Sequence, residues 1–425
     1  MTVFRSDAAQ AAALDRDDPL ATFRARFHLP QHTGRDEIYL CGNSLGLQPR
    51  STERHMREEL EDWQRLGVKG HFDGRRPWMP YHEFFAEGTA RVVGAKPAEL
   101  VNMNSLTVNL HLMMTSFYRP TPKRHKIVIE RGAFPSDRYA VESQIRLHGL
   151  DPDTSLIELT PGEGRSHIEE SEIEALLAAD GSAIALLMLP GVQYYSGQVF
   201  DMARITQAGH AVGCMVGFDL AHAVGNLPLK LHDWDMDFAV WCNYKYMNAG
   251  PGAVAGCFVH ERHARDFDRP RLAGWWGHEK QTRFRMGPEF VPMAGAEGWQ
   301  LSNPSVFGLA PLLASLEIFD EAGMERLRTK SLQLTAYLEF LLKEKLSREV
   351  EILTPADPAR RGCQLSLRLH AGRNQARRVF ERLEAAGVTG DWREPDVIRV
   401  APVPLYNSYA DVFGFVDILA GLVAG

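Results

Sequence analysis

The sequence has few cysteines and no long apolar run. Its five cysteines are widely spaced and odd in number, so they show neither the CxxC pairs of a zinc site nor a disulfide framework. No apolar stretch reaches the roughly 18 residues of a membrane helix, and acidic residues interrupt the N-terminal region where a secretory signal needs a continuous apolar segment. These absences predict a cytoplasmic protein whose cysteines are reduced.

A basic excess is missing too. The chain has 47 Lys plus Arg against 54 Asp plus Glu, a formal net charge of -7, which does not favour binding to nucleic acid or to an anionic membrane. It also lacks internal repeats and low-complexity linkers. With 425 residues, 45% of them hydrophobic, the chain can bury enough core for two domains. We therefore expect a globular protein that acts on a small molecule and holds no metal.

Short apolar segments alternate with helical stretches between about residues 50 and 300. Helices placed between strands predict a largely parallel sheet, and hence an α/β domain. The expected strands of this domain are 126–130, 184–189, 215–219, 238–241 and 256–259.

Beyond Pro304 the pattern changes to a long helical stretch, 307–344, which predicts a smaller α+β domain. We divide the chain into an N-terminal arm, a large domain and a small C-terminal domain, with the boundaries 1–50, 51–305 and 306–425. In the small domain we expect strands at 350–353, 364–369 and 397–400 and a helix at 374–386.

Lys245 follows an apolar strand and precedes a glycine-rich turn, in the segment AVWCNYKYMNAGPG. A single lysine is usually a solvated surface residue. The flanking sequence here predicts burial, which an ammonium tolerates only with a partner or a depressed pKa. A desolvated lysine is the group that Schiff-base chemistry uses.

Asp219 ends the predicted strand of GCMVGFDLAHAVG, and His222 follows inside the start of a possible helix. Ligand sites of open α/β sheets lie at such strand ends. Alone, Asp219 would more simply cap that helix. Combined with Lys245, it suggests a carboxylate that faces the pyridinium nitrogen of pyridoxal 5'-phosphate (PLP) and makes the ring an electron sink.

Two further segments could complete a PLP site. In NSLTVN, 104–109, the backbone N–H groups of a helix start and the Thr107 hydroxyl suit a phosphate, although an ordinary helix cap has the same residues. In AFPSD, 133–137, Phe134 could lie over the cofactor ring or could be a packed aromatic in a turn.

Segments along most of the chain resemble the kynureninase family of PLP enzymes, which has the aspartate-aminotransferase-like fold (fold type I). They are YLCGNSLG, MNSLTVNLHL, AFPSD, GVQYYSGQ, GFDLAHAVGN, WCNYKYMNAGPG, GWWGH and IRVAPVPLYNS. Cysteine desulfurases and other class V aminotransferases do not share this ordered series as a whole. The resemblance implies hydrolysis of L-kynurenine or 3-hydroxy-L-kynurenine to anthranilate or 3-hydroxyanthranilate plus L-alanine, in tryptophan degradation or NAD biosynthesis.

The resemblance also implies roles for single residues. Lys245 would carry PLP and move the α-proton, Tyr244 would deliver a proton to the β-carbon, and Arg399 would bind the substrate α-carboxylate. Without the resemblance, Arg399 would be taken for a surface arginine. The implied cofactor contacts are Leu106, Thr107, Phe134, Pro135, Ser136, Asp137, Asp219, His222, Tyr244, Lys245, Trp275 and Asn303.

Trp275 and Asn303 correspond to residues that the neighbouring subunit donates, which implies a homodimer with shared sites. His71 and Asn303 resemble the residues of relatives that accept a ring 3-hydroxyl, although His71 could equally be a loop histidine. The sequence departs from the family at Pro190, where some relatives have a serine that contacts the cofactor, so one contact is missing or replaced.

Two alternatives stay open at this point. Another fold type I enzyme, such as an aminotransferase or a cysteine desulfurase, would make different products, and a desulfurase would also need a mobile, reactive cysteine. A non-catalytic binding protein could keep the same fold, although the presence of both Lys245 and Asp219 argues against it.

Overall fold

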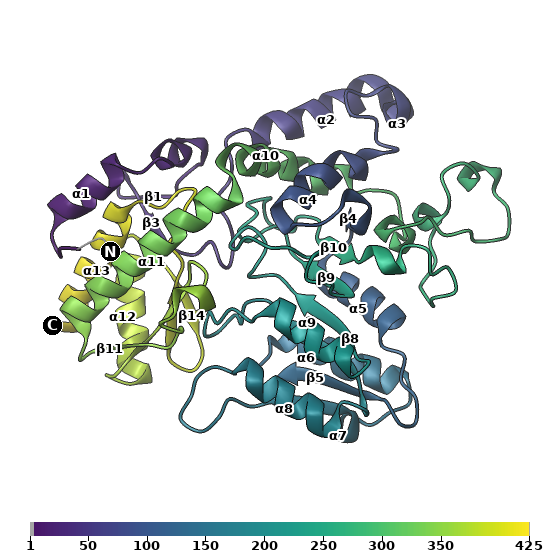
Figure 1. Cartoon of the computed structure of the whole chain (residues 1–425). Helices are drawn as coiled ribbons and strands as arrows, with labels where there is room; N and C mark the ends of the chain where they lie inside the picture. Colours follow the sequence, from purple (N-terminus) through teal and green to yellow (C-terminus); the bar gives the residue numbers. More distant parts are fainter. Residues whose placement is uncertain (1–3, 425) are drawn as a thin grey trace.

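The computed structural model describes residues 4–424, and its centre is a seven-stranded sheet (Figure 1). The strand order is β4-β10-β9-β8-β7-β5-β6, with parallel pairing from β9 to β6 and antiparallel pairing of β10 with both of its neighbours. The expected α/β class with a mainly parallel sheet is confirmed. The strands are β4 (Leu100–Asn102), β5 (Lys126–Glu130), β6 (Leu156–Leu159), β7 (Ile184–Pro190), β8 (Met215–Asp219), β9 (Phe238–Trp241) and β10 (Gly256–Val259).

Most strands of this sheet, such as β7 and β9, are buried on both faces, which is why they are nearly continuous apolar runs. On β5, Ile127 and Ile129 join one core with α5 (Leu106–Phe117) and α6 (Pro135–Leu147). Val128 points to the opposite face and packs in a second core with α8 (Glu170–Asp180) and α9 (Met202–Ala211).

Further helices extend the first part of the chain. The long α2 packs along α10, which carries the chain towards the C-terminal region. These helices are α2 (Thr52–Leu66), α3 (Gly70–Asp73), α4 (Ala86–Val93), α7 (Pro152–Ser155) and α10 (Val306–Ala322).

A separate antiparallel sheet, in the order β11-β12-β15-β14, lies in the C-terminal part of the chain. The long helical stretch expected at 307–344 is confirmed and consists of two helices, because Gly323, with φ +75°, separates α10 from α11. The elements are α11 (Met324–Leu346), β11 (Val350–Ile352), β12 (Leu365–Leu369), α12 (Arg373–Ala385), β14 (Asp391–Arg393), β15 (Val397–Val400) and α13 (Tyr409–Ala424).

The N-terminal segment packs against this C-terminal part, with α1 (Ala8–Arg16) lying on α13. The Asp15 carboxylate accepts hydrogen bonds from the backbone N–H groups of Tyr409 (2.6 Å) and Ala410 (3.0 Å), so it satisfies the start of α13. Two short pairings also belong to this region, β1 (Gln31–His32) with β2 (Arg35–Asp36), and β3 (Ile38–Tyr39) with β13 (Val388–Thr389).

The proposed division has an arm at 1–50, a large domain at 51–305 and a small domain at 306–425. The contact of α1 with α13 agrees with an arm on the small domain, whereas α10 packs on α2 and in the core of the large sheet, so its contacts place residues 306–322 with the large domain. A membrane-spanning helix is not found among residues 4–424, since none of their helices combines the length and the apolar character that crossing requires.

Candidate active site

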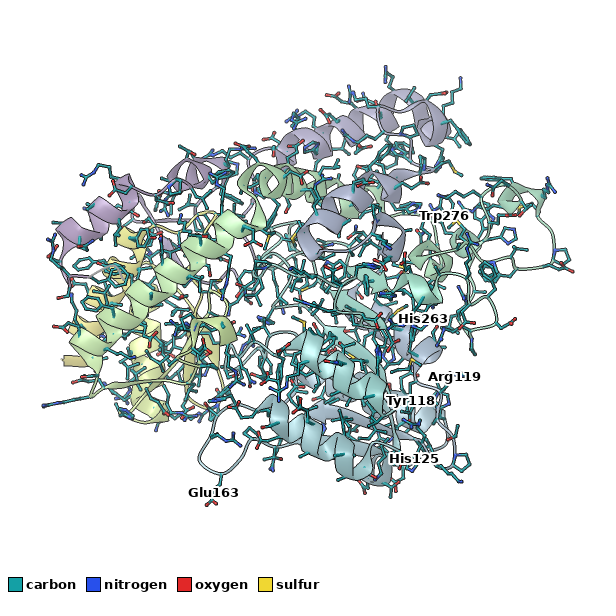
Figure 2. The ribbon with its side chains drawn as sticks, in the orientation of Figure 1. Tyr118, Arg119, His125, Glu163, His263 and Trp276 are labelled. Atoms are coloured by element: carbon teal, nitrogen blue, oxygen red, sulfur yellow. The ribbon has the colours of Figure 1, made fainter. Side chains whose placement is uncertain are left out.

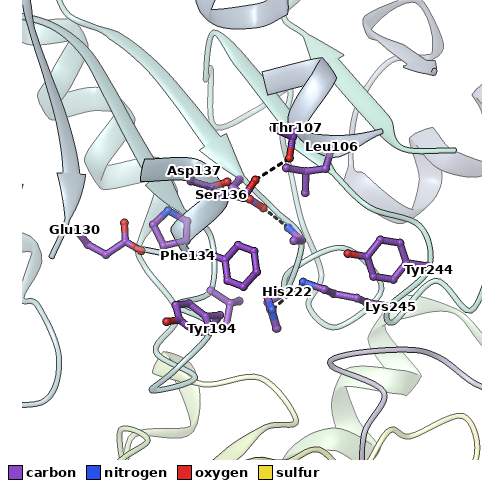
Figure 3. A pocket seen from close by; sticks show the side chains of 14 residues that line it. Leu106, Thr107, Glu130, Phe134, Ser136, Asp137, Tyr194, His222, Tyr244 and Lys245 are labelled. Carbon is purple, nitrogen blue, oxygen red and sulfur yellow. Dashed lines mark hydrogen bonds between the residues drawn. The ribbon is translucent and has the colours of Figure 1, made fainter. Parts of the chain in front are cut away.

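A cavity of about 540 Å³ lies at the carboxyl-terminal ends of β5, β7 and β8 (Figure 3). Its position, at the carboxyl ends of strands, is the one that open α/β sheets use for ligands. The lining residues are Leu106, Thr107, Glu130, Phe134, Ser136, Asp137, Pro190, Val192, Tyr194, Asp219, Ala221, His222, Tyr244 and Lys245.

The Lys245 side chain is one of the groups that line this cavity. Its Nζ atom is 3.0 Å from His222 Nε2 and 6.0 Å from the centre of the Phe134 ring. Burial, and then the Lys245 charge, hold the pKa of His222 well below its usual value, so this imidazole is neutral. The amine therefore donates to a neutral ring nitrogen inside the cavity.

Asp219 does not cap a helix. Its Oδ1 atom accepts the backbone N–H of Ala221 at 2.6 Å, which closes a turn directly after β8. The helix expected around His222 is therefore wrong, because the residues that follow Asp219 form successive turns. This turn leaves the carboxylate in the wall of the cavity.

Asp219 and Asp137 form a buried pair of acids. Desolvation is the main cause that raises the pKa of both carboxyls, and the neighbouring Asp219 charge pushes the pKa of Asp137 well above its usual range. Two adjacent carboxylates in a buried site do not both ionise, so Asp137 keeps its proton and donates to Asp219.

The starts of two helices meet on another wall of the cavity. Thr107 is the second residue of α5 and Ser136 the second residue of α6, and their hydroxyl oxygens are 2.9 Å apart (Figure 3). Neither helix has a side-chain hydrogen bond at its N-cap, at Ser105 or Phe134. The N–H groups of the first turns and the two hydroxyls suit a phosphate.

The sequence analysis did not identify Glu130, Val192, Tyr194 and Ala221 as site residues. Glu130 is 4% exposed, and burial, with the Asp219 charge as a smaller cause, raises its pKa to about 8. A signal for Glu130 was present, because this residue ends a predicted parallel strand as Asp219 does. The other three lie in connecting segments with no comparable pattern.

Arg399 lies directly behind the cavity wall and is buried, so it is not a surface arginine. Its Nη1 donates to the Tyr194 carbonyl at 2.7 Å, and its Nη2 pairs with Asp391. The Tyr194 ring in turn packs edge-on against Phe134, with ring centres 5.3 Å apart. Tyr194 thus connects Arg399 on β15 to the aromatic ring in the cavity.

Five predicted site residues do not line this cavity in the single chain, namely Arg399, described above, and Pro135, His71, Trp275 and Asn303. Pro135 begins α6 beside it, and His71 packs on Trp78 with ring centres 5.5 Å apart. Trp275 is 47% exposed and Asn303 is exposed. Trp276, the neighbour of Trp275 in the chain, lies on the side of the molecule away from the C-terminal sheet (Figure 2).

Comparisons with known proteins agree with the geometry. Residues 327–419 match the family model of the kynureninase C-terminal domain. The chain is 60% identical over 408 residues to a kynureninase of Koribacter versatilis, and 60% identical over 409 residues to one of Xanthomonas euvesicatoria, in each case over 96% of both proteins.

Solved structures of cysteine desulfurases share the fold. The apo enzyme of Thermococcus onnurineus superposes with a TM-score of 0.75 at 17% identity, covering 100% of both chains. The Escherichia coli enzyme gives a TM-score of 0.74 at 16% identity, covering 100% of this chain and 98% of that one. At this identity the likeness concerns the fold alone.

Glu130 predicts a pH-dependent stability of the cofactor-free chain. Its pKa of about 8 in the folded state lies above the usual 4.5 of the unfolded chain. Between these two values the unfolded chain ionises this carboxyl more readily than the folded chain does. The free energy of unfolding therefore falls as the pH rises through this range. We expect Glu130→Gln to melt at a higher temperature than the unsubstituted chain at pH 8. The free energy of unfolding of Glu130→Gln, relative to that of the unsubstituted chain, should be higher at pH 8 than at pH 5 by on the order of a few kcal/mol.

Thermal unfolding followed by circular dichroism at several pH values measures this difference. Glu158→Gln is the matched control, because Glu158 pairs in register with Ile129 on the neighbouring strand but forms an ion pair with Arg138 outside the cavity. Equal pH dependence with and without Glu130→Gln would contradict the buried acid.

Proposed function

The chain belongs to the kynureninase family, and we propose that it is a PLP enzyme that hydrolyses L-kynurenine, 3-hydroxy-L-kynurenine or both. The products are L-alanine and anthranilate or 3-hydroxyanthranilate. The observation that carries this proposal is the Lys245 amine, held 3.0 Å from a neutral His222 in a cavity that also contains the buried Asp219.

The cavity residues fit PLP. Phe134 is 43% exposed although it lies in a cavity wall, so one face of its ring is free to stack on a cofactor ring. Asp219 offers a carboxylate to the pyridine nitrogen, and Thr107 and Ser136 at the starts of α5 and α6 would hold the phosphate. When bound, PLP supplies an electron sink for the bonds that change at the substrate.

The remaining chemistry is carried by side chains of this chain. Lys245 would hold the cofactor and, once released by the substrate amine, move the proton of the α-carbon. The neutral His222 accepts a hydrogen bond from Lys245 and so orients its amine. Tyr244, whose pKa is raised by burial and which therefore keeps its proton, would deliver a proton to the β-carbon.

Arg399 would bind the α-carboxylate of the substrate. Its guanidinium is buried, and its Nε has no hydrogen-bond partner among the described residues. Arg399 reaches the cavity wall through the Tyr194 carbonyl, so a carboxylate on that side would gain a charged and directional partner. This contact would fix the orientation of the substrate bonds.

The desulfurase alternative is not favoured. Burial raises the pKa of Cys41 and Cys363 to about 12 and that of Cys214 to about 11, and Cys242 and Cys257 are buried as well. A nucleophilic cysteine needs the opposite, a lowered pKa and access to the substrate. The family membership and the lysine-bearing cavity likewise disfavour a non-catalytic binding protein.

We also propose a homodimer with shared active sites. The exposed Trp275 and Asn303 have no place in the cavity of their own chain, and the segment that carries them presents further exposed apolar side chains. In a dimer they would complete the partner's site, and His71 with Asn303 would accept the ring hydroxyl of 3-hydroxykynurenine.

Product analysis tests the reaction. With PLP and either substrate, we expect equimolar alanine and aromatic amine from the purified protein, measured by chromatography. Lys245→Ala should abolish turnover, because no other amine lines the cavity among the described residues. Lys343→Ala, which removes an exposed ion pair with Glu339, should leave the rate unchanged. Bound PLP without either product would contradict the proposed reaction.

Arg399→Ala should lower kcat/KM by the equivalent of about 2 to 5 kcal/mol, because a buried charge pair loses one member. Steady-state kinetics measures the loss. Arg393→Ala is a suitable control, since Arg393 also pairs with Asp391 (3.0 Å) but does not contact Tyr194. A loss of less than about threefold in Arg399→Ala would exclude the carboxylate role.

Mixing two inactive variants tests the shared site. We expect Lys245→Ala and Trp275→Ala chains, each nearly inactive alone, to regain activity when their subunits exchange. In the mixed dimer one site combines the intact Lys245 of one chain with the intact Trp275 of the other. If Trp275 served the site of its own chain, no mixed dimer would contain an intact site, and activity would stay absent.

A further inference from the structure

A second cavity, of about 670 Å³, adjoins the active-site cavity. Glu130 and Tyr194 line both cavities, so they form the wall between them. The far side of the second cavity is formed by exposed or half-exposed residues, among them Ser166, His167 and Glu394, and therefore faces solvent. This wall thus separates the reaction site from a cavity that faces solvent.

The Glu130 carboxyl stands in this wall without a side-chain partner. It is 4% exposed, and its own backbone N–H group is the hydrogen-bond donor that acts on it. Figure 3 shows the Tyr194 hydroxyl on the side of the cavity where Glu130 lies. The titratable groups that face it across the site are Asp219 on β8, Asp137 on α6 and Lys245 after β9, and those of the second cavity are Arg131, His167 and Glu394.

The hydrolysis proposed above, on which this inference rests, has a fixed proton balance. Each turnover consumes one water, whose oxygen enters the new aromatic carboxyl group. One of its hydrogens ends in the methyl group of alanine. The other leaves as a proton, because an aromatic carboxylic acid is ionised at neutral pH. A buried site must therefore admit one water and release one proton in every cycle.

We propose that Glu130 is the proton relay between the active-site cavity and the second cavity. The protonated carboxyl gives its proton to a water molecule in the second cavity, and the carboxylate then takes up the proton released in the active site. Only O–H bonds break and form, and Glu130 ends the cycle as it began. Its raised pKa, about 8, keeps both forms accessible near neutral pH.

Glu130→Gln tests the relay, since it keeps the shape of the side chain and removes its exchangeable acid proton. In the PLP-loaded enzyme we expect unchanged cofactor absorbance and a KM within about twofold, with kcat lowered at least about tenfold and its pH profile altered. Glu130→Asp, which keeps a carboxyl, should restore part of kcat. Glu158→Gln, on the neighbouring strand β6 and outside both cavities, should match the unsubstituted enzyme.

A second variant tests the path without touching the active site. Ser166 lines only the second cavity, so Ser166→Phe should narrow it, lower kcat and leave KM unchanged. In both variants a pH indicator should record proton release that is slowed together with product formation.

Three results would overturn the relay. The first is a kcat of Glu130→Gln within about threefold of normal. The second is a loss of kcat in Glu130→Gln that Ser166→Phe does not share. The third, if Glu130→Gln does not fold, is full activity in Ser166→Phe. Failure of the unsubstituted enzyme to form alanine would instead reject the hydrolysis itself, so the two failures are distinguishable.

Discussion

The burial of ionisable groups at one edge of the central sheet is the constraint on which the site depends. Asp219, Asp137 and Glu130 lie with Lys245 and His222 around one cavity, and a buried charge there requires a partner. Few charges are therefore present, because the pKa values of Glu130 and Asp137 are raised and favour the protonated acids, and the pKa of His222 is lowered and favours the neutral imidazole. A bound pyridinium and phosphate would complete the balance, which explains why a cofactor with both charges suits this cavity.

The segment after β7 connects the two sheets through the same site. The Tyr194 carbonyl accepts from Arg399 and from Gln364 (3.1 Å), and the Tyr195 carbonyl accepts from Ser366 at 2.5 Å. The position of the C-terminal sheet is therefore coupled to the Tyr194 ring, and through it to Phe134. A movement of the C-terminal sheet would therefore displace Arg399, the proposed substrate-binding arginine, together with Phe134, the proposed stacking ring.

Much of this site follows from the sequence, because strand ends are easy to locate in continuous apolar runs. Four of the five expected strands of the large sheet match at both ends, and they place Asp219 and Lys245 correctly at its carboxyl edge. The short β4 and the half-buried β6 were missed, since neither is a clear apolar run. Tyr194 could not be predicted because its role comes from contacts with residues distant in the chain. Trp275 and Asn303 could be assigned only by resemblance, as no single-chain pattern brings them to the cavity.

Pro190 shows how one departure from the family affects the acids around it. It ends β7 in register with Asp219 and lines the cavity beside Glu130. Where some relatives have a serine, this chain has a side chain that offers no hydroxyl, so the neighbouring carboxyls lose a possible donor. An acid without donors is more stable in its neutral form, which agrees with the raised pKa of Glu130. The hydroxyls of Thr107 and Ser136 lie on a different wall, so the proposed phosphate contacts do not depend on the residue at position 190.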